Sequence, residues 1–320
     1  MWTPCANFQK MKKKLNLLYL LIVAILISGM LPACLPEEPS NGENELEMDT
    51  QENVLIIAHR GARSLAPENT IAAAIKALET DADGWELDVA MSLDGELVVI
   101  HDDTLERTSN AKAVFPDRSP WSVDDFTYEE LTRLDFGSWF VDSDPLEQTA
   151  LGNITDADIE KYRGEKIPTL REALIFTKEN NWWVNVEIKD ASGTPADAMI
   201  VSGVVDLIIE LDMQESVLIS SFNHNYLKQV RSLNKDIATG ALVNKIVKDP
   251  IALMEELDAQ AFHPGMQVTY AKQVQSLREA GYDVNVWTVN EESDLRDLIA
   301  MGVTGIITDF PQDFVPLLRP

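Results

Sequence analysis

Short apolar runs alternate with longer amphipathic stretches along most of the chain after residue 53. The runs have the length and composition of buried parallel strands, and the stretches between them have the spacing of helices, the first expected from Thr70 to Leu78. This alternation predicts an α/β fold, a TIM (β/α)8 barrel covering residues 54–320. The eight strands are expected at Val54–Ala58, Gly84–Ala90, Trp183–Ile188, Val217–Ser221, Ala238–Leu242, Ala259–Phe262, Val284–Thr288 and Gly305–Thr308.

One further apolar run, Leu97–His101, does not fit the alternation. It is separated from the second predicted strand by a segment that is too short for a crossover helix and carries the turn signal Asp94-Gly95. We therefore expect this run to return antiparallel to the second strand, as a hairpin on the barrel rim. That return would bring His101 back to the mouth of the barrel.

An insertion follows the hairpin and occupies about residues 110–166. A helix is predicted within it from Val123 to Leu134. Its aromatic residues could form a lid over the substrate, or they could pack the insertion onto the barrel. Packing is favoured because buried aromatic side chains are common. The residues concerned are Trp121, Phe126, Trp139 and Phe140.

Residues that can do chemistry lie at the ends of the predicted strands. Successive side chains on a strand point to opposite faces, so Glu86 and Asp88 share one face, as do Glu187 and Lys189. Strand ends of a parallel barrel meet at one mouth, where active sites of this fold are built. We therefore expect three carboxylates to gather in one cavity.

Three carboxylates in one cavity repel one another unless a cation lies between them. Ligation by oxygen alone suits one divalent cation, Ca²⁺ or Mg²⁺, rather than zinc, which prefers Cys and His. Any single acidic pair could instead form salt bridges on the rim, but the joint occurrence favours a metal site. Its predicted ligands are Glu86, Asp88 and Glu187.

Histidines and cationic residues complete a set that suits the cleavage of a phosphodiester. His59 and His101 can exchange protons with substrate oxygens near neutral pH. Arg60 and Lys189 can bind phosphate oxygens and stabilise negative charge in the transition state, although both could instead neutralise the nearby acids.

These residues belong to a series of short motifs that occur in order between about Val54 and Pro311. Together the motifs resemble those of the bacterial glycerophosphodiester phosphodiesterase family. They are His59-Arg60-Gly61-Ala62, Pro67-Glu68-Asn69-Thr70, Glu86-Leu87-Asp88-Val89, His101-Asp102, Arg107-Thr108, Ile167-Pro168-Thr169-Leu170, Val186-Glu187-Ile188-Lys189 and Val286-Trp287-Thr288-Val289-Asn290.

The resemblance implies a metal-dependent hydrolase of phospholipid and glycerol metabolism that converts glycerophosphodiesters to sn-glycerol 3-phosphate and an alcohol. It implies that His59 and His101 act as base and acid in turn, and that Trp287 walls the substrate pocket. Glu68 is expected to support the site without touching the metal. Core packing is the alternative for Trp287.

Three other functions are weighed against this one. Two are phosphodiesterases of the same barrel type, one like phospholipase D and one like the metal-free phospholipase C that cleaves phosphatidylinositol. The third is a non-catalytic lipoprotein that binds a ligand. The three carboxylates argue against the metal-free enzyme, and the presence of both histidines argues against the binder.

Charge restricts the partners of the protein. The formal net charge is −27, and it falls to −31 without residues 1–33, which hold four lysines and no acidic residue. Nucleic acid is therefore excluded as a partner. A small anionic substrate must be held by local positive groups, and no protein partner is inferred.

The N-terminal segment has the pattern of a secretory signal, with lysines at 12–14 followed by an apolar run to Leu31. Residues 1–33 are interpreted as a signal peptide because the apolar run ends in a lipobox-like sequence, Leu31-Pro32-Ala33, directly before Cys34. Met11 is an alternative start of the chain. The acidic stretch 34–53 would be a disordered tether. A membrane-spanning anchor is the alternative.

Both interpretations export the domain. The lipoprotein would lie on the outer face of the bacterial cytoplasmic membrane or in the periplasm, attached to the membrane through lipid on Cys34.

We predict that the mature chain begins at a diacylated Cys34, and that Cys34→Ser yields unlipidated protein, since the thiol is the site of attachment. Intact-mass spectrometry of the membrane fraction checks this. An unmodified Cys34 with residues 1–33 still attached would identify the anchor as a transmembrane helix.

Overall fold

The computed structural model describes residues 54–319. The predicted signal peptide, Cys34 and the tether up to residue 53 lie outside the described residues. Among residues 54–319, no helix has the length and apolar character needed to cross a membrane.

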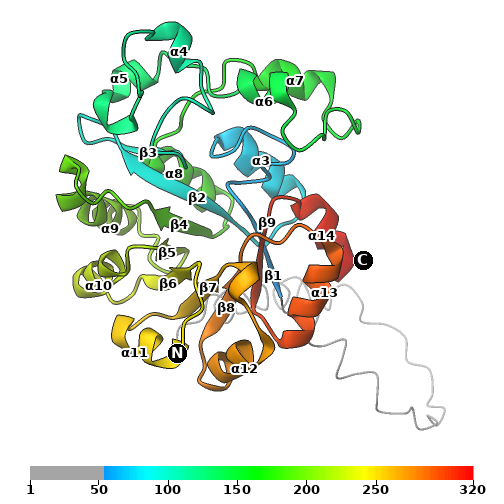
Figure 1. Cartoon of the computed structure of the whole chain (residues 1–320). Coiled ribbons are helices and arrows are strands. Elements are labelled where there is room, and N and C mark those ends of the chain that lie inside the picture. The colour runs from blue at the N-terminus through cyan, green and yellow to red at the C-terminus, as the bar shows by residue number, and fades with distance from the viewer. Residues whose placement is uncertain (1–53, 320) are drawn as a thin grey trace, which may run out of the picture.

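Eight parallel strands form a closed barrel within residues 54–319, in the order β1-β9-β8-β7-β6-β5-β4-β2 (Figure 1). The barrel closes where Ile57 of β1 pairs with Gly84 of β2. The predicted fold class is confirmed. The strands are β1 (Leu55–Ala58), β2 (Gly84–Met91), β4 (Val184–Ile188), β5 (Val217–Ser221), β6 (Ala238–Val243), β7 (Ala261–Pro264), β8 (Asp283–Val286) and β9 (Gly305–Thr308).

Amphipathic helices surround the barrel and cover its outer surface (Figure 1). The first begins one residue later than predicted because Thr70 is its N-cap, and the Thr70 side chain accepts a hydrogen bond from the Ala73 backbone NH. The helices are α3 (Ile71–Glu79), α8 (Leu170–Glu179), α9 (Ile200–Glu210), α10 (His224–Leu233), α11 (Pro250–Leu257), α12 (Ala271–Glu279), α13 (Glu292–Met301) and α14 (Pro311–Leu318).

The main core lies between the outer face of the barrel and these helices. Trp85 on β2 is fully buried there, stacked on Trp182 at 6.4 Å between ring centroids. Its indole NH donates to Thr177 Oγ1 at 2.9 Å, so the one polar atom of the ring is satisfied. Because Trp85 faces outward, its neighbour Glu86 faces the barrel interior.

The rim hairpin forms as predicted. Strand β3 (Leu97–Val99) pairs antiparallel with β2, Val99 opposite Val89. The Ile100 NH then donates to the Asp88 carbonyl at 3.0 Å, which carries the chain back along β2. His101 therefore returns to the end of the barrel where Asp88 lies.

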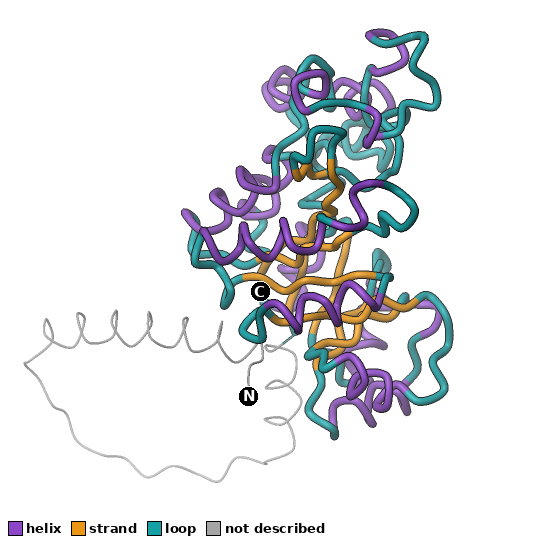
Figure 2. The backbone as a smooth tube through the Cα atoms, turned by 90° about the vertical axis from the view of Figure 1, so that its left-hand side faces the viewer, coloured by secondary structure: helices purple, strands orange, loops and turns teal. Residues whose placement is uncertain are grey.

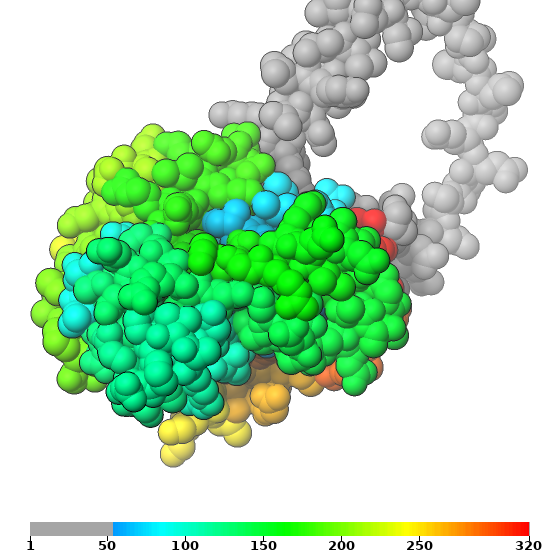
Figure 3. Space-filling view, turned by 90° about the horizontal axis from the view of Figure 1, so that it is seen from above, coloured from blue at the N-terminus to red at the C-terminus, as the bar shows by residue number. Residues whose placement is uncertain are grey.

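The insertion packs against one side of the barrel, next to β3 and α3 (Figure 1), where it projects beyond the barrel (Figure 2), and it covers much of the face seen in Figure 3. Its elements are α4 (Ala111–Val114), the 3-10 turn η1 (Val123–Asp125), α5 (Tyr128–Leu131), α6 (Ser138–Ser143) and α7 (Asp156–Tyr162).

The continuous helix predicted from Val123 to Leu134 is wrong. Phe126 adopts an extended conformation, with its ring buried in the insertion's own core. Thr127 then starts a new helix through a capping box with Glu130. Burial of one aromatic ring thus outweighs local helical spacing.

The insertion's aromatic residues pack onto their surroundings. Phe140 lies edge-on to Tyr162 at 5.9 Å and belongs to a cluster with Ala66 and Ala73 beside α3. Trp121 and Trp139 are partly buried against neighbouring clusters. These contacts favour the packing interpretation over the lid.

Gly61 fixes the loop between β1 and α3, where its NH approaches the carbonyls of Ala58 and Glu86. Its φ is +78°, and a Cβ there would lie 2.6 Å from backbone and side-chain atoms of Ala73. We predict that Gly61→Ala lowers the free energy of unfolding by about 2–4 kcal/mol, because strain and overlap add.

Gly95 is the matched control, since its φ is +88° but no atom lies within 4 Å of the position that a Cβ would occupy. Gly95→Ala should cost only about 1 kcal/mol, the strain alone. Urea denaturation of both variants checks the difference. Equal losses would contradict the close approach of Gly61 to α3.

Candidate active site at the mouth of the barrel

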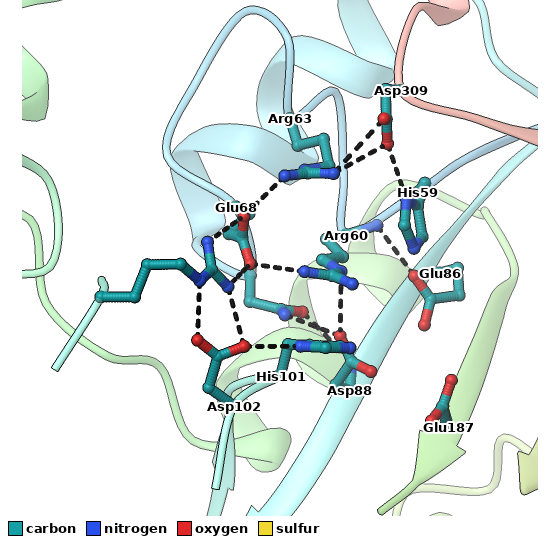
Figure 4. A network of polar contacts seen from close by, with 12 residues as sticks. His59, Arg60, Arg63, Glu68, Glu86, Asp88, His101, Asp102, Glu187 and Asp309 are labelled. Carbon is teal, nitrogen blue, oxygen red and sulfur yellow. Dashed lines mark hydrogen bonds and ion pairs between the residues drawn. The ribbon is translucent and has the colours of Figure 1, made fainter. Parts of the chain in front are cut away.

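The predicted site residues converge at the carboxyl ends of the barrel strands (Figure 4). His59 directly follows β1, and Glu86 and Asp88 lie on β2. Glu187 on β4 pairs in register with Asp88, which places these two carboxylates side by side. The hairpin brings His101 to the same end.

Glu86, Asp88 and Glu187 form one acidic cluster, with an oxygen of each within 4.8 Å of the others. Burial, then the charges of Asp88 and Glu187, raise the pKa of Glu86 well above its ordinary value. Burial and Asp88 likewise raise the pKa of Glu187. Burial also opposes ionisation of Asp88, but Arg60 and Lys189 outweigh it and lower that pKa.

The donor set fits one divalent cation. In the network of ion pairs around the acidic cluster, six carboxylates face four cationic side chains, so two negative charges are left over. All three clustered ligands are hard oxygen donors, as Ca²⁺ and Mg²⁺ require. The carboxylates are Glu68, Glu86, Asp88, Asp102, Glu187 and Asp309, and the cations are Arg60, Arg63, Arg107 and Lys189.

Asn185 gives a second sign that the cavity receives a ligand. It lies opposite Glu86 in the sheet and lines the cavity. The residue is only 1% exposed, yet its amide oxygen has no hydrogen-bond partner within residues 54–319. An unpaired buried amide is costly, so a bound group would satisfy it. Its role was not predicted from the sequence.

His59 is held by a carboxylate that was not predicted from the sequence. Its Nδ1 lies 2.6 Å from Oδ1 of Asp309, which follows β9. Burial opposes ionisation of Asp309, but the hydrogen bond from His59 keeps that pKa below its usual range. Asp309 is therefore ionised and accepts the Nδ1 proton.

Burial lowers the pKa of His59 despite the hydrogen bond to Asp309. The imidazole is thus neutral near pH 7, and with Nδ1 protonated its Nε2 carries a free lone pair. His59 lines the cavity. This is the state required of a general base.

His101 has a carboxylate partner of its own. Its Nδ1 lies 2.7 Å from Asp102 Oδ1, and Arg107 donates to both oxygens of Asp102 at 2.7 and 2.9 Å. Burial opposes ionisation of Asp102, but these donors hold its pKa below the usual range. The His101 side chain is 34% exposed against 14% for His59, so His101 is the more open of the two.

Glu68 links three arginines beneath the site. It accepts hydrogen bonds from Arg60, Arg63 and Arg107 at 2.7 to 3.1 Å. Burial opposes its charge, but the hydrogen bond from Arg107 and the charge of Arg60 lower its pKa to about 2. Glu68 lies outside the acidic cluster, and its supporting role stays a prediction.

Arg60 and Lys189 neutralise site carboxylates in this structure. Arg60 donates to Glu68 and lies 3.5 Å from Asp88. Lys189 lies 3.0 Å from Glu187 and 3.6 Å from Asp88. Arg60 lines the cavity as well, so the phosphate-binding role of these two residues stays a prediction.

Two neighbouring pockets at the barrel mouth, called here the inner and outer lobes of the cavity, share three lining residues. The inner lobe, about 90 Å³, is lined by His59, Glu86, Asn185 and Trp287. The outer lobe, about 390 Å³, is lined by Asp102, Asp103, Lys189 and Asp190. His101, Glu187 and Phe222 border both lobes.

Trp287 walls the inner lobe with Phe222, which lies edge-on to it at 5.5 Å between ring centroids. The indole NH of Trp287 donates to the His263 carbonyl at 2.9 Å. Trp287 was predicted from the sequence, but Phe222, which directly follows β5, was not.

A hollow of about 1050 Å³ lies at the opposite end of the barrel, beside Arg231, Asp258 and Tyr282. It holds none of the predicted site residues, so size does not mark the active site here. The other two histidines lie apart from the acidic cluster. His224 contacts the Leu242 carbonyl, and burial lowers the pKa of His263 to about 3.

Known proteins match this chain over most of its length. A model of the glycerophosphoryl diester phosphodiesterase family matches residues 59–313. A glycerophosphodiester phosphodiesterase of Caldanaerobacter subterraneus is 36% identical over 265 residues, which cover 83% of this chain and 98% of that protein. Another, from Bacillus altitudinis, is 34% identical, covering 82% and 97%.

The fold has the same relatives. An Oleispira antarctica phosphodiesterase, solved in complex with the product sn-glycerol-3-phosphate, superposes with a TM-score of 0.70 at 28% sequence identity. The match covers 83% of this chain and 97% of that one.

Repulsion within the acidic cluster gives a stability prediction for metal-free protein. Because the folded-state pKa of Glu86 is raised above 4.5, the fold loses stability as pH rises through the interval between the unfolded and folded pKa values. Glu86→Gln removes this cost. Its gain in unfolding free energy should be absent near pH 4 and reach about 1–3 kcal/mol at pH 8.

Denaturant titrations in chelator at both pH values measure this gain. Glu160→Gln is the control, because Glu160 is exposed and lies outside the cluster. A Glu86→Gln variant less stable than the parent protein at pH 8 would show that the cluster is not strained.

Proposed function

The chain belongs to the glycerophosphoryl diester phosphodiesterase family, and from this we propose that it hydrolyses glycerophosphodiesters to sn-glycerol 3-phosphate and an alcohol, using one divalent cation and two histidines. One observation carries the proposal. Two histidines, each hydrogen-bonded to an ionised aspartate, border a cavity that is also lined by Glu86 and Glu187, two of the three clustered carboxylates.

Glu86, Asp88 and Glu187 would hold the cation, and their oxygens suit Ca²⁺ as well as Mg²⁺. When bound, the cation supplies positive charge that polarises the phosphate and offsets the negative charge of the transition state. Arg60 and Lys189 would add charge for the phosphate oxygens once the cation has taken over the carboxylates they now neutralise.

His59 would act as the base in the first step. Its free Nε2 can accept the proton of the attacking oxygen, from water or from the glycerol hydroxyl next to the phosphate. Asp309 stabilises the imidazolium that results and holds the ring in position. A hydroxyl attack gives a cyclic phosphate, which water then opens.

His101 would act as the acid that protonates the leaving alcohol. It borders the wide outer lobe, where a variable alcohol has room, whereas His59 lines the inner lobe alone. Asp102, to which Arg107 donates, holds the ring at Nδ1, so Nε2 is the atom that would deliver the proton. In the second step the two histidines exchange roles.

The alternative functions receive less support. A metal-free phosphodiesterase would have no use for three clustered carboxylates that repel one another. A non-catalytic binder is disfavoured by the family and by the two histidine–aspartate pairs. An activity like phospholipase D on lysolipids would use the same groups, and the products formed would identify it.

The location of the enzyme is a separate proposal that rests on the sequence before residue 54. Lysines 12–14, the apolar run and Cys34 support an exported lipoprotein on the outer face of the bacterial cytoplasmic membrane or in the periplasm. Its substrate would then be hydrolysed outside the cytoplasm.

Metal removal should abolish turnover. EDTA is expected to lower the rate of sn-glycerol 3-phosphate release at least about 10²-fold, because the cation stabilises transition-state charge worth several kcal/mol. Added Ca²⁺ or Mg²⁺ should restore it, and EDTA presaturated with Ca²⁺ is the control. Full activity in free EDTA would revive the metal-free phosphodiesterase.

Replacement of either histidine should affect turnover far more than substrate binding. His59→Ala and His101→Ala are each expected to lower kcat at least about 10²-fold, with the fold retained. The double variant should lose much less than the product of the two single losses, because both act on one reaction path.

His224→Ala is the matched control, since His224 lies outside the acidic cluster and its ring contacts a backbone carbonyl. It should keep the parent kcat. A single His59 or His101 variant that turns over at the parent rate would show that the paired acid–base assignment is wrong.

A further inference from the structure

We propose that the outer lobe of the cavity selects a cationic alcohol, so that the enzyme prefers glycerophosphodiesters of amino alcohols to those of neutral polyols. This inference rests on the proposed function and adds the class of alcohol to it. It is supported by two negative charges without a cationic partner in the described part of the chain and by an exposed aromatic ring, all in the lobe where the alcohol would leave.

The outer lobe is where the alcohol must lie. The inner lobe is the smaller of the two, and its Glu86 and the unpaired amide oxygen of Asn185 can accept hydrogen bonds from the glycerol hydroxyls. His101 stands between the lobes and would protonate the leaving oxygen. The rest of the alcohol therefore extends beyond His101 into the outer lobe.

Two carboxylates in this lobe have no cationic partner among residues 54–319. Asp103 is exposed, and no ion pair engages its side chain. Asp190 accepts hydrogen bonds from Ser192 Oγ at 2.6 Å and Asn223 Nδ2 at 3.0 Å. Both donors are neutral, and they lower the pKa of Asp190, so its charge is kept but not cancelled.

The other charges of the lobe are already compensated. Asp102 is paired with Arg107. Lys189 is paired with Glu187 and Asp88, and under the proposed function its charge would be taken by the phosphate once the cation holds these carboxylates. Asp103 and Asp190 therefore remain as two uncompensated negative charges on opposite segments of one lobe, after β3 and after β4.

Phe222 supplies a complementary surface. It is 40% exposed at the end of β5 and borders both lobes. Its edge contact with Trp287 holds the ring, and an aromatic face attracts an ammonium group or the methyl groups around one. A neutral polyol can donate hydrogen bonds to the carboxylates but brings no opposite charge, and it would leave the exposed ring without an apolar partner.

The experiment compares kcat/KM for glycerophosphocholine and glycerophosphoethanolamine with that for glycerophosphoglycerol and glycerophosphoinositol, using the full chain. Release of sn-glycerol 3-phosphate is measured for all four. The cationic substrates should be favoured about tenfold, and the preference should shrink with added salt. The combined variant Asp103→Asn with Asp190→Asn should bring the ratio close to one, through KM.

Asp206→Asn combined with Glu160→Gln is the charge-matched control, because both acids are exposed and neither lines the cavity. It should leave the ratio unchanged. Equal use of neutral and cationic substrates by the parent protein would overturn the inference, as would a ratio unaffected by the Asp103/Asp190 variant. Absence of sn-glycerol 3-phosphate from every substrate would instead overturn the proposed function, and the inference with it.

Discussion

Mutual repulsion of three buried carboxylates is the constraint on which the rest of the site depends. Glu86, Asp88 and Glu187 gather on adjacent strands of the barrel, away from bulk water. Such a cluster is stable only with positive charge around it. Arg60 and Lys189 supply part of that charge, and the two negative charges left over in the network around the cluster match one divalent cation in magnitude. Under the proposed function, this cation would be held by the cluster and would also attract the anionic substrate.

The two histidines have the same kind of partner but different surroundings. Each has an ionised aspartate at Nδ1, so each presents Nε2 for proton transfer. They differ in surroundings, because His59 is buried beside the inner lobe and His101 is open to the outer one. Arginines joined by Glu68 connect the two pairs, since Arg63 contacts Asp309 and Arg107 contacts Asp102. Under the proposed function, position relative to the cavity would divide base from acid.

Features that depend on local pattern could be predicted from the sequence. Strand count, the antiparallel return of β3 and the shared face of Glu86 and Asp88 follow from periodicity and turn chemistry. Side-chain pairs made by closure of the barrel could not be found in this way. Asp309 is 250 residues from His59 in sequence and reaches it only because β1 pairs with β9. The position of Asp309 at a strand end was the one signal for it in the sequence.

Phe222 and Asn185 were missed for a related reason. Only the assembled cavity shows that the Phe222 ring is exposed and that the Asn185 amide oxygen has no partner among the described residues. The broken helix after Val123 is a case of tertiary burial overriding local propensity.

The histidines and the clustered carboxylates together should direct cleavage at the phosphorus atom, with release of the alcohol. Hydrolysis of a glycerophosphodiester in water enriched in oxygen-18, followed by phosphorus NMR and mass spectrometry, shows which bond breaks. We expect label in sn-glycerol 3-phosphate and none in the alcohol. Label in the alcohol, or formation of glycerol and a phosphorylated alcohol, would contradict the assigned roles.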